Sequence, residues 1–494
     1  MSCSCPSPVD GFAFPEDQIV AARERHGLLS MEIEFSLVCN FRCVYCYNDG
    51  EPDEPPLTSS EIDDVLQQAK ALGARKIVVL GGEPMLYPEI KQKLLTVREL
   101  GLDVEMFTNG SHMTPENARF MFDHDIAVVL KMNTLDAGLQ NRLAGHKDAH
   151  RIISAAAENL AAAGYPSPGK RLAYSTVICE PNLEELPDLW RSLRRRGIEP
   201  YFEMITPQGR ANESDWLFVS SERQRELFEE LSRIDREEFG RRWEPQPPLA
   251  GNRCLRHQFS CLVNSRGIVM PCVGVTIPLG SVREEPLRDI LDKSEVMENL
   301  RDFPNRIKSP CSACGKVRVC YGCRGAAYQL TGDYLAADPL CWHNQGKSIE
   351  RLPADVTPYV PHRRPMLMVD KLLSIGERCA RLRATVTPDN LFTDENGLLD
   401  DTIYVELVAQ AIAALHGFHQ PARERDDHRG FLLGAKNFVV SGEAHAGDVL
   451  EIDLRKVGRL GDFGVVAGTI YRGDVETAHG EVTVWQTSEG TESS

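Results

Sequence analysis

Short runs of β-branched and aromatic residues alternate with amphipathic windows of helical spacing between residues 31 and 204. The expected strands are residues 31–37, 75–80, 102–107, 126–132, 171–178 and 199–204. Helix-start signals lie between them: Thr58 with Glu61, Pro88, Thr114 with Pro115, and Asn182 with Glu185. Six strand–helix units in series predict a parallel sheet or barrel with helices outside, and functional residues just after the strand C-termini.

The pattern changes beyond a polar stretch at residues 345–351, which indicates a linker and a domain boundary near residue 350. Two strand-like runs at 366–375 and 379–387 precede one apolar helix at 402–418. Further strands are expected near 430–440, 448–457, 463–473 and 476–487. One helix beside a long antiparallel sheet predicts an α+β domain.

Composition narrows the class of protein. A length of 494 residues corresponds to about three domains. The net charge of -17 argues against nucleic-acid binding and against an anionic membrane surface, which both need clustered cations. The chain starts without a basic-then-apolar signal peptide and has no segment of about 20 apolar residues, so we expect a cytoplasmic protein. In that reducing compartment, 15 cysteines indicate metal binding or catalysis rather than disulfides.

The cysteines fall into two groups and four single residues. A tight trio lies near the start, and a set of eight lies between residues 254 and 341. Cys3, Cys5, Cys179 and Cys379 stand outside both groups, and the sequence assigns them no role. Cys179 and Glu203 end predicted strands; we expect a buried thiol and a surface carboxylate, with a substrate-side base or hydrogen donor as the alternative.

The trio Cys39, Cys43 and Cys46 follows the first predicted strand directly. Three thiolates this close can hold three corners of a small iron–sulfur cluster and leave the fourth metal open to a cofactor. A zinc site is the alternative, but tetrahedral zinc needs a fourth ligand and no His or Cys follows nearby. The next two strands end in residues 81–84, Gly-Gly-Glu-Pro, and residues 108–110, Thr-Asn-Gly. Paired glycines permit close backbone approach, and a carboxylate can bind an ammonium group.

These motifs resemble those of the radical S-adenosylmethionine (SAM) superfamily, over about residues 31–210. The resemblance covers the CxxxCxΦC signature, with Tyr45 as the aromatic Φ, and the GGEP motif on the next strand. It implies a partial (β/α)6 barrel, in which Cys39, Cys43 and Cys46 hold a [4Fe-4S] cluster whose unique iron binds the amino and carboxylate groups of SAM. It also implies SAM binding at Tyr45, Gly81, Gly82, Glu83, Asn109 and Asn133, with Glu83 on the methionine ammonium. Asn133 is a candidate ribose contact, with a simple strand-end turn as the alternative. The implied reaction is cleavage of SAM to a 5′-deoxyadenosyl radical, with electrons from flavodoxin or ferredoxin.

The eight-cysteine set resembles the SPASM extension of radical SAM enzymes, a small domain that holds auxiliary [4Fe-4S] clusters. Its core is Cys311-x2-Cys314-x5-Cys320-x2-Cys323, followed at a distance by Cys341. In that family the two ligand sets interleave. The resemblance therefore implies one auxiliary cluster on Cys254, Cys261, Cys272 and Cys323, a second on Cys311, Cys314, Cys320 and Cys341, and three clusters in all. Two zinc ribbons are the alternative.

The segment from 350 to about 488 resembles the hotdog-fold 3-hydroxyacyl-ACP dehydratases. The resemblance is carried by residues 361–370, PHRRPMLMVD, by Glu406-Leu-Val-Ala-Gln410 on the apolar helix, and by Gly447-Asp448 before a strand. The catalytic His of that family precedes the helix, but residues 394–400 contain no His here. Glu406 remains as a catalytic candidate, and His362 matches a motif that is not the family's catalytic His. We expect a thioester-binding or dimerising domain, and a homodimer.

The expected domains are an N-terminal extension at 1–30, a radical SAM barrel at 31–235, a SPASM domain at 236–347 and a hotdog domain at 350–490. The first functional hypothesis is hydrogen abstraction from an acyl or peptidyl group on a carrier protein or CoA. The second is a maturase of a precursor peptide, with the hotdog domain used only for dimerisation. A bifunctional enzyme with added dehydratase activity and a non-enzymatic electron or scaffold protein are further alternatives.

Overall fold

A computed structural model describes residues 14–48, 55–376, 378–388, 391–419, 430–460 and 463–486. Cys3 and Cys5 lie outside these residues. Contacts divide the chain into two compact units. The first comprises Met1–Leu330 and Tyr334–Ile349, and the second comprises Thr331–Asp333 and Glu350–Ser494. Each unit has a large hydrophobic core of its own.

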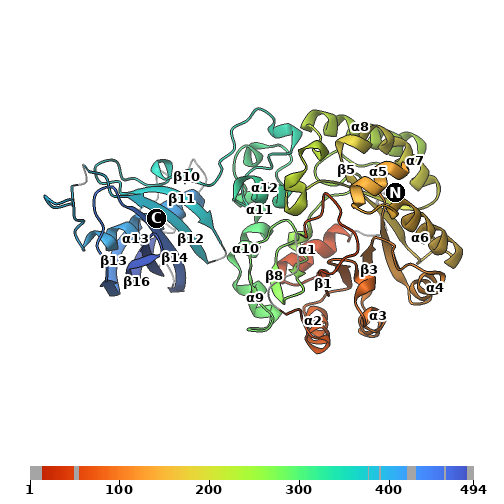
Figure 1. Cartoon of the computed structure of the whole chain (residues 1–494), viewed down its shortest axis with the longest axis horizontal. Coiled ribbons are helices and arrows are strands. Elements are labelled where there is room, and N and C mark those ends of the chain that lie inside the picture. The colour runs from red at the N-terminus through yellow and green to blue at the C-terminus, as the bar shows by residue number, and fades with distance from the viewer. Residues whose placement is uncertain are drawn as a thin grey trace, which may run out of the picture. The chain divides into compact units, whose positions relative to one another are not determined.

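Six parallel strands form the centre of the first unit, in the order β6-β5-β4-β3-β2-β1 (Figure 1). They are β1 (Ser30–Glu34), β2 (Lys76–Leu80), β3 (Asp103–Thr108), β4 (Ile126–Lys131), β5 (Leu172–Ile178) and β6 (Glu199–Met204). All six predicted strands are confirmed within three residues at each end. Their pairing is parallel throughout, as a sheet built from consecutive strand–helix units requires. This is the partial barrel that the sequence predicts.

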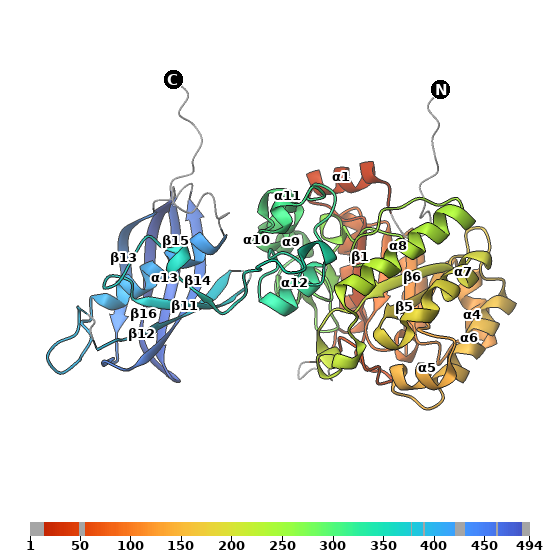
Figure 2. The same cartoon turned by 90° about the horizontal axis from the view of Figure 1, so that it is seen from above.

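Helices cover the outside of this sheet (Figures 1 and 2). They are α2 (Ser59–Ala71), α3 (Ile90–Glu99), α4 (Pro115–Asp123), α5 (Ala137–Ala144), α6 (Ala149–Ala163), α7 (Leu186–Arg195) and α8 (Ser221–Glu238), and α1 (Glu16–Glu24) precedes β1. Thr58 and Glu61 form the predicted capping box, and Thr114 caps α4. Two of the predicted helix starts, at Pro88 and at Asn182, are wrong. Helix α3 begins two residues after Pro88, and Asn182 lies in a 3-10 turn, Glu180–Glu185, before α7.

The side chain of Asn182 connects strand ends instead of capping a helix. It accepts a hydrogen bond from the Cys179 backbone N–H at 3.0 Å and donates to the carbonyls of Asn133 and Val177 at 2.8 and 2.9 Å. The residue is almost completely buried. Buried backbone groups at strand ends need partners, and this amide supplies them.

The cysteine-rich segment extends the same sheet beyond β1. Strand β7 (Leu262–Val263) pairs in parallel with β1 and continues into an antiparallel run of β8 (Ile268–Met270) and β9 (Gly280–Ser281). Short helices α9 (Leu287–Lys293), α10 (Glu295–Arg301), α11 (Phe303–Arg306) and α12 (Arg324–Thr331) follow. Because β7 lies beside β1, this segment borders the strand whose end carries the cysteine trio.

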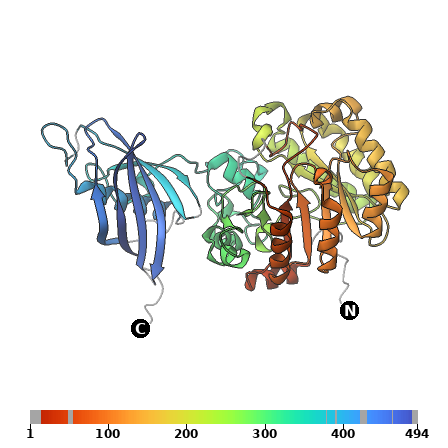
Figure 3. The same ribbon diagram turned by 60° about the horizontal axis from the view of Figure 1, so that its bottom comes forward.

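The second unit is an antiparallel sheet packed against one apolar helix (Figure 3). The strand order is β10-β11-β12-β14-β15-β16-β13. The strands are β10 (Ala354–Asp355), β11 (Val369–Ile375), β12 (Cys379–Thr385), β13 (Gly430–Val440), β14 (Val449–Leu460), β15 (Phe463–Arg472) and β16 (Val475–Gln486). Helix α13 (Ile403–His419) contacts strands β11 to β16. This is the predicted α+β layout of a hotdog domain.

Candidate active site

The loop that carries Cys39, Cys43 and Cys46 is held on two sides by hydrogen bonds to its backbone. The N–H groups of Arg42 and Val44 donate to the carbonyls at the end of α5, at 3.1 and 3.0 Å. From the segment after β6, the Arg210 side chain donates to the Cys43 carbonyl and its backbone N–H donates to the Cys46 carbonyl, both at 3.0 Å. The three cysteines therefore have a defined arrangement at the mouth of the barrel.

The three thiols lie within range of one another's charge. Burial raises the pKa of the Cys43 thiol to about 12, and negative charge on Cys46 and Cys39 adds to this increase. Burial also raises the pKa of Cys39. Coordination to a cationic metal centre removes the protons of such thiols, so the raised pKa values of Cys39 and Cys43 are compatible with metal ligation.

The two glycines after β2 allow that strand end to lie directly against the cysteine loop. The Gly82 N–H donates to the Ser36 carbonyl and the Glu83 N–H donates to the Val38 carbonyl, both at 2.9 Å. A Cβ at Gly82 would lie 2.1 Å from the Val38 oxygen, and one at Gly81 would lie 2.4 Å from the Ser36 oxygen. Gly81 also has a positive φ of 113°. No side chain fits at either position.

Glu83 is buried and receives three hydrogen bonds. One carboxylate oxygen accepts from the Met85 N–H at 3.1 Å and from the Thr108 hydroxyl at 2.7 Å, and the other accepts from the Asn109 N–H at 2.7 Å. Burial raises the pKa of Glu83, while these donors act in the opposite direction. Glu83 thus joins the end of β2 to the end of β3. A carboxylate has about four acceptor sites, so a fourth donor such as an ammonium group can still bind.

Asn109 and Asn133 occupy different environments. The Asn109 amide donates to the Asn40 side chain at 3.0 Å and to the sulfur of Cys39 at 3.8 Å, and it lines a cavity. Asn133 is completely buried; its amide donates to the Tyr45 hydroxyl at 2.7 Å and accepts from the Val177 N–H at 3.0 Å. Asn133 therefore positions Tyr45 in this structure, and its contact with a ribose stays a prediction.

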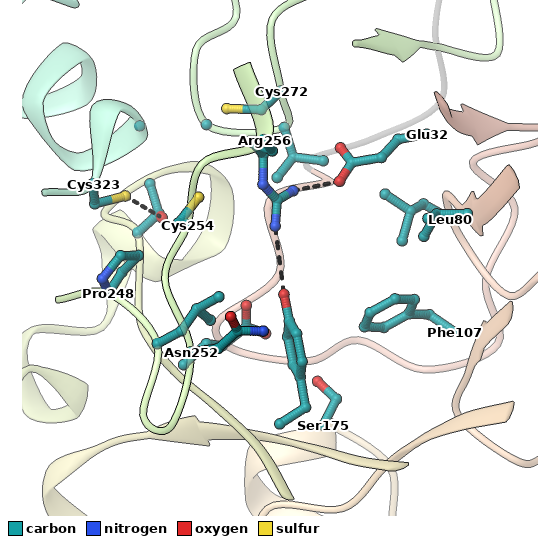
Figure 4. Close-up of a pocket in the computed structure, with 18 of the residues that line it drawn as sticks. Glu32, Leu80, Phe107, Ser175, Pro248, Asn252, Cys254, Arg256, Cys272 and Cys323 are labelled. Carbon is teal, nitrogen blue, oxygen red and sulfur yellow. Dashed lines mark hydrogen bonds and ion pairs between the residues drawn. The ribbon is translucent and has the colours of Figure 1, made fainter. Parts of the chain in front are cut away.

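A cavity of about 970 Å³ extends from the cysteine trio to the cysteine-rich segment. Cys39, Cys43 and Cys46 line one part of it, and Cys254, Cys272 and Cys323 line another. Figure 4 shows the latter three sulfurs on one side of the cavity, and Glu32, Leu80 and Phe107 on the opposite side. The cavity thus brings together cysteines that are up to 284 positions apart in the sequence.

Charged side chains line the cavity as three pairs of opposite sign. Lys76 binds Glu105 at 2.8 Å, Lys131 lies 3.5 Å from Glu203, and Arg256 binds Glu32. Arg256 also donates to the Tyr201 hydroxyl at 3.4 Å (Figure 4). Lys131 of the second pair also donates to the Ser175 hydroxyl, at 3.0 Å. The sequence predicts a surface carboxylate at Glu203, but the structure places Glu203 in the lining of the cavity.

Cys254, Cys272 and Cys323 are brought together, whereas Cys261 is not among them. Burial raises the pKa of Cys323 to about 12, and the charges of Asp338, Cys254 and Cys272 raise it further. Cys261 instead belongs to the hydrophobic core of the first unit, and the cavity lining found in the described part of the chain does not include it.

A second group contains Cys311, Cys320 and Cys341. Burial raises the pKa of Cys341 to about 12, and the charges of Asp338, Cys311 and Cys320 contribute to this increase. The Asn344 amide donates to the sulfur of Cys311 at 3.2 Å. Cys314 is half-buried nearby in sequence, and its N–H donates to the Cys311 carbonyl at 3.0 Å. The two groups alternate along the chain, and their assignment to two auxiliary clusters stays a prediction.

Buried Asp338 lies between these groups. One of its oxygens accepts from the Cys323 N–H at 2.7 Å, and the other accepts from the Leu340 N–H at 2.9 Å. Cys323 belongs to the first group, and Leu340 directly precedes Cys341 of the second. Asp338 therefore fixes the backbone next to one cysteine of each group.

Among the described residues, no three His, Cys, Asp or Glu side chains could hold a single metal ion. Zinc needs its four ligands around one atom, whereas a [4Fe-4S] cluster puts iron and sulfide between its thiolates. Cys179 belongs to neither group; it is buried in a small core beside β5.

Several cavity residues were missed by the sequence reasoning. Tyr47 donates to Glu34 at 2.6 Å, close to Gly81, and Lys131 lies 5.0 Å from the centre of the Tyr45 ring. Lys131, Ser175 and Tyr201 lie on consecutive strands β4, β5 and β6. Polar residues within otherwise apolar strands were the available signal, since a buried charge requires a partner.

In the second unit, Glu406 on α13 faces His362. The two side chains are 3.8 Å apart between Nε2 and Oε1, and each is about one-third exposed. Gln410 donates to Glu406 at 2.9 Å and to the Met366 carbonyl at 2.8 Å, and it accepts from the Met368 N–H at 2.9 Å. The glutamine therefore fixes the carboxylate relative to the loop before β11.

Three family models match the chain. The radical SAM superfamily matches residues 33–193, the SPASM iron-sulfur cluster-binding domain matches residues 254–315, and the ApeP dehydratase family matches residues 354–493. The fold and the cysteine loop thus define a radical SAM enzyme, which uses SAM and iron–sulfur clusters. More specifically, the chain is a radical SAM/SPASM enzyme fused to a C-terminal ApeP-like, hotdog-fold dehydratase-like domain.

Curated relatives cover the radical SAM and SPASM part. The AdoMet-dependent heme synthase of Methanosarcina barkeri is 27% identical, over 64% of this chain and 96% of the relative. The PqqA peptide cyclase of Streptomyces rochei is 27% identical, over 65% of this chain and 90% of the relative. The mycofactocin maturase MftC of Mycolicibacterium smegmatis is 25% identical, over 63% of this chain and 82% of the relative.

Among solved structures, SuiB of Streptococcus suis bound to its precursor peptide SuiA has the same fold as the first part of the chain. The TM-score is 0.52 at 20% identity, and the match covers 67% of this chain and 82% of SuiB. No helix in the described residues is long and apolar enough to cross a membrane.

Proposed function

We propose that this enzyme abstracts hydrogen from a polar acyl group, aminoacyl or peptidyl, presented as a thioester on a carrier protein or CoA. Cys39, Cys43 and Cys46 hold the cluster that binds SAM, and two auxiliary clusters on the cysteine-rich segment make three in all. When bound and reduced, the cluster and SAM supply the 5′-deoxyadenosyl radical that removes the hydrogen atom. Flavodoxin or ferredoxin is the proposed electron donor.

The cavity between the trio and the first auxiliary group carries this proposal. It offers about 970 Å³, within the range of small-molecule sites, so the end of a tethered substrate fits there. Gly81, Gly82 and Asn109 border the cavity beside the trio, where SAM is expected, and Tyr45 lies beside them. Substrate in this space contacts the walls of the barrel, which replace part of the bulk water that radical chemistry has to avoid.

The charged walls favour a polar substrate. Glu32, Glu105 and Glu203 are paired with three cations among the residues that line the cavity, and Glu32 and Glu105 are buried. A saturated acyl chain placed against these ion pairs would remove water from them and offer no hydrogen bonds of its own, which is unfavourable. Amide, amino and carboxylate groups of an aminoacyl or peptidyl substrate can bind such donors and acceptors directly.

The ApeP-like domain supports thioester recruitment, since the domain family that it matches is named for a dehydratase. Its edge strand β13 also supports the proposed homodimer. Phe431, Leu432 and Leu433 follow one another on that strand with 48%, 44% and 52% of their surface exposed. An exposed apolar sheet edge is a surface that a second sheet edge can cover.

Deletion of residues 350–494 tests the recruitment. The separate cores of the two units predict that the shortened chain keeps its iron and its unfolding temperature. We expect that it forms 5′-deoxyadenosine with a pantetheine-linked substrate much more slowly than the full chain, mainly through a higher KM. Equal rates for carrier-bound substrate would refute recruitment.

A peptide maturase is the second candidate, because the named relatives include a PqqA peptide cyclase and SuiB was solved with its precursor peptide. In that case the second unit serves only for dimerisation. Substrate-dependent 5′-deoxyadenosine with an untethered peptide, unaffected by the deletion, would favour this candidate.

Added dehydratase activity is supported by one observation, the 3.8 Å approach of His362 to Glu406. Such a pair can exchange a proton with a 3-hydroxyacyl thioester. The variants His362→Ala and Glu406→Gln would each lower dehydration by at least about 100-fold if the pair is the acid–base couple. Arg364→Ala, at a residue exposed in the same loop, is the matched control.

A further inference from the structure

We propose that His257, and not Cys261, is the fourth ligand of the first auxiliary cluster, together with Cys254, Cys272 and Cys323. This inference rests on the proposed auxiliary cluster at that position. It changes the expected ligand set from four thiolates to three thiolates and one imidazole.

The environment of Cys261 is that of a core residue. Only 1% of its surface is exposed, and it belongs to the hydrophobic core that also contains Leu287, Ile290 and Met297. Its backbone is part of the sheet connection, since its carbonyl accepts from the Glu32 N–H at 2.9 Å. Cys261 precedes β7 directly, so its orientation is set by the pairing of β7 with β1.

His257 has the properties that a ligand position requires. It lines the cavity, only 1% of its surface is exposed, and neither ring nitrogen has a hydrogen-bond partner among the residues that the structure describes. A buried imidazole normally satisfies at least one nitrogen. An iron atom is a partner that would do so, and imidazole is a common ligand of iron.

Local geometry places His257 beside the cysteine group. It lies in a 3-10 turn, Arg256–Gln258, that begins two residues after Cys254. The His257 ring is 5.5 Å from the ring of Tyr321, measured between centroids, and the Tyr321 hydroxyl donates to the sulfur of Cys254 at 3.9 Å. Tyr321 thus contacts both His257 and the sulfur of Cys254, and His257 and Cys254 line the same cavity.

An imidazole ligand changes the electrochemistry of the cluster. It is neutral where a thiolate is negative, and histidine ligation raises the reduction potential of iron–sulfur centres. The guanidinium of Arg256, next to His257, lies close to the thiols of Cys254 and Cys272 and acts in the same direction. The cluster that borders the cavity would then accept an electron more readily than an all-cysteine cluster.

Iron content tests the ligand set in full-length protein. A background variant with Cys39, Cys43 and Cys46 changed to Ala should retain about 8 Fe per chain after anaerobic reconstitution. Adding Cys272→Ser should lower this to about 4, whereas adding Cys261→Ala should leave about 8. Cys179→Ala, at another buried core thiol, is the matched folding control.

Pulsed EPR of the reduced background variant identifies the nitrogen. Protein labelled with [15N]histidine should show a strongly coupled 15N nucleus that disappears in His257→Ala. His257→Cys should keep about 8 Fe, lose the coupling and shift one midpoint potential to a lower value.

The outcomes separate the two levels of the proposal. Loss of about 4 Fe in Cys261→Ala, or no histidine coupling in the background variant, overturns the assignment of His257 and leaves the auxiliary cluster intact. If Cys272→Ser loses no iron either, the auxiliary cluster itself is absent and the proposed function fails at that point.

Discussion

Replacement of Glu83 by Gln tests whether this carboxylate holds together the end of the barrel that carries the cysteine loop. The substitution keeps the size of the side chain but changes one carboxylate oxygen to an NH2 group. The retained oxygen can still accept from Met85 and Thr108. The NH2 group would then face the Asn109 N–H, which donates to the carboxylate at 2.7 Å.

The expected decrease in the free energy of unfolding follows from the loss of this hydrogen bond to Asn109. A hydrogen bond to a charged acceptor contributes about 1.5–3 kcal/mol, and the two retained bonds weaken because their acceptor becomes neutral. Glu83 is only 2% exposed, so water cannot replace the lost acceptor. We expect the free energy of unfolding of the first unit to fall by about 2–4 kcal/mol.

Urea unfolding followed by tryptophan fluorescence measures this change, because four of the five tryptophans lie in the first unit. The matched control is Glu116→Gln, at an exposed residue with one surface ion pair, Lys91 at 3.0 Å. Its effect should stay below about 0.5 kcal/mol. If Glu83→Gln changes the unfolding free energy no more than the control, the three hydrogen bonds do not stabilise this end of the barrel.

Two further substitutions examine packing and charge in the first unit. Gly82→Ala places a Cβ 2.1 Å from the Val38 oxygen, so we expect the free energy of unfolding to fall by about 1–3 kcal/mol and the trio site to hold less iron. The control Gly138→Ala, in helix α5, should not destabilise the protein. Similar losses of stability in both variants would contradict the reasoning. Asp235→Ala removes the buried partner of Arg194, 2.8 Å away, and should cost about 3–5 kcal/mol by calorimetry. A cost below about 1 kcal/mol would show that Glu199, 2.9 Å from Arg194, compensates the guanidinium by itself.

Most of the fold was predictable because each element carries a local signal. The strands of the barrel are short, apolar and regularly spaced, and the alternation with helices allows only a parallel arrangement. The capping residues Thr58 and Thr114 act within one turn, so their signals were reliable. Asn182 has the same local appearance, but its amide satisfies backbone groups of two neighbouring strands, which no local pattern reveals.

The candidate site was predictable where function depends on spacing along the chain. The trio needs three thiols in one loop, and Gly81 and Gly82 must lack side chains because the cysteine loop lies against them. The partners of buried polar groups were not predictable in this way. Asn133 binds Tyr45, and Arg256 binds Glu32, across 88 and 224 residues respectively.

The sequence by itself determined the chemistry of this protein: the number and spacing of its cysteines, the GGEP motif and the change of pattern near residue 350 indicate a radical SAM/SPASM enzyme with a hotdog domain. Only the tertiary structure decided which of these side chains share a cavity. Cys261 and His257 are four residues apart in one loop, and spacing alone favours the thiol. The pairing of β7 with β1 directs Cys261 into the core and leaves the buried imidazole of His257 at the cavity, because side-chain direction depends on long-range backbone pairing.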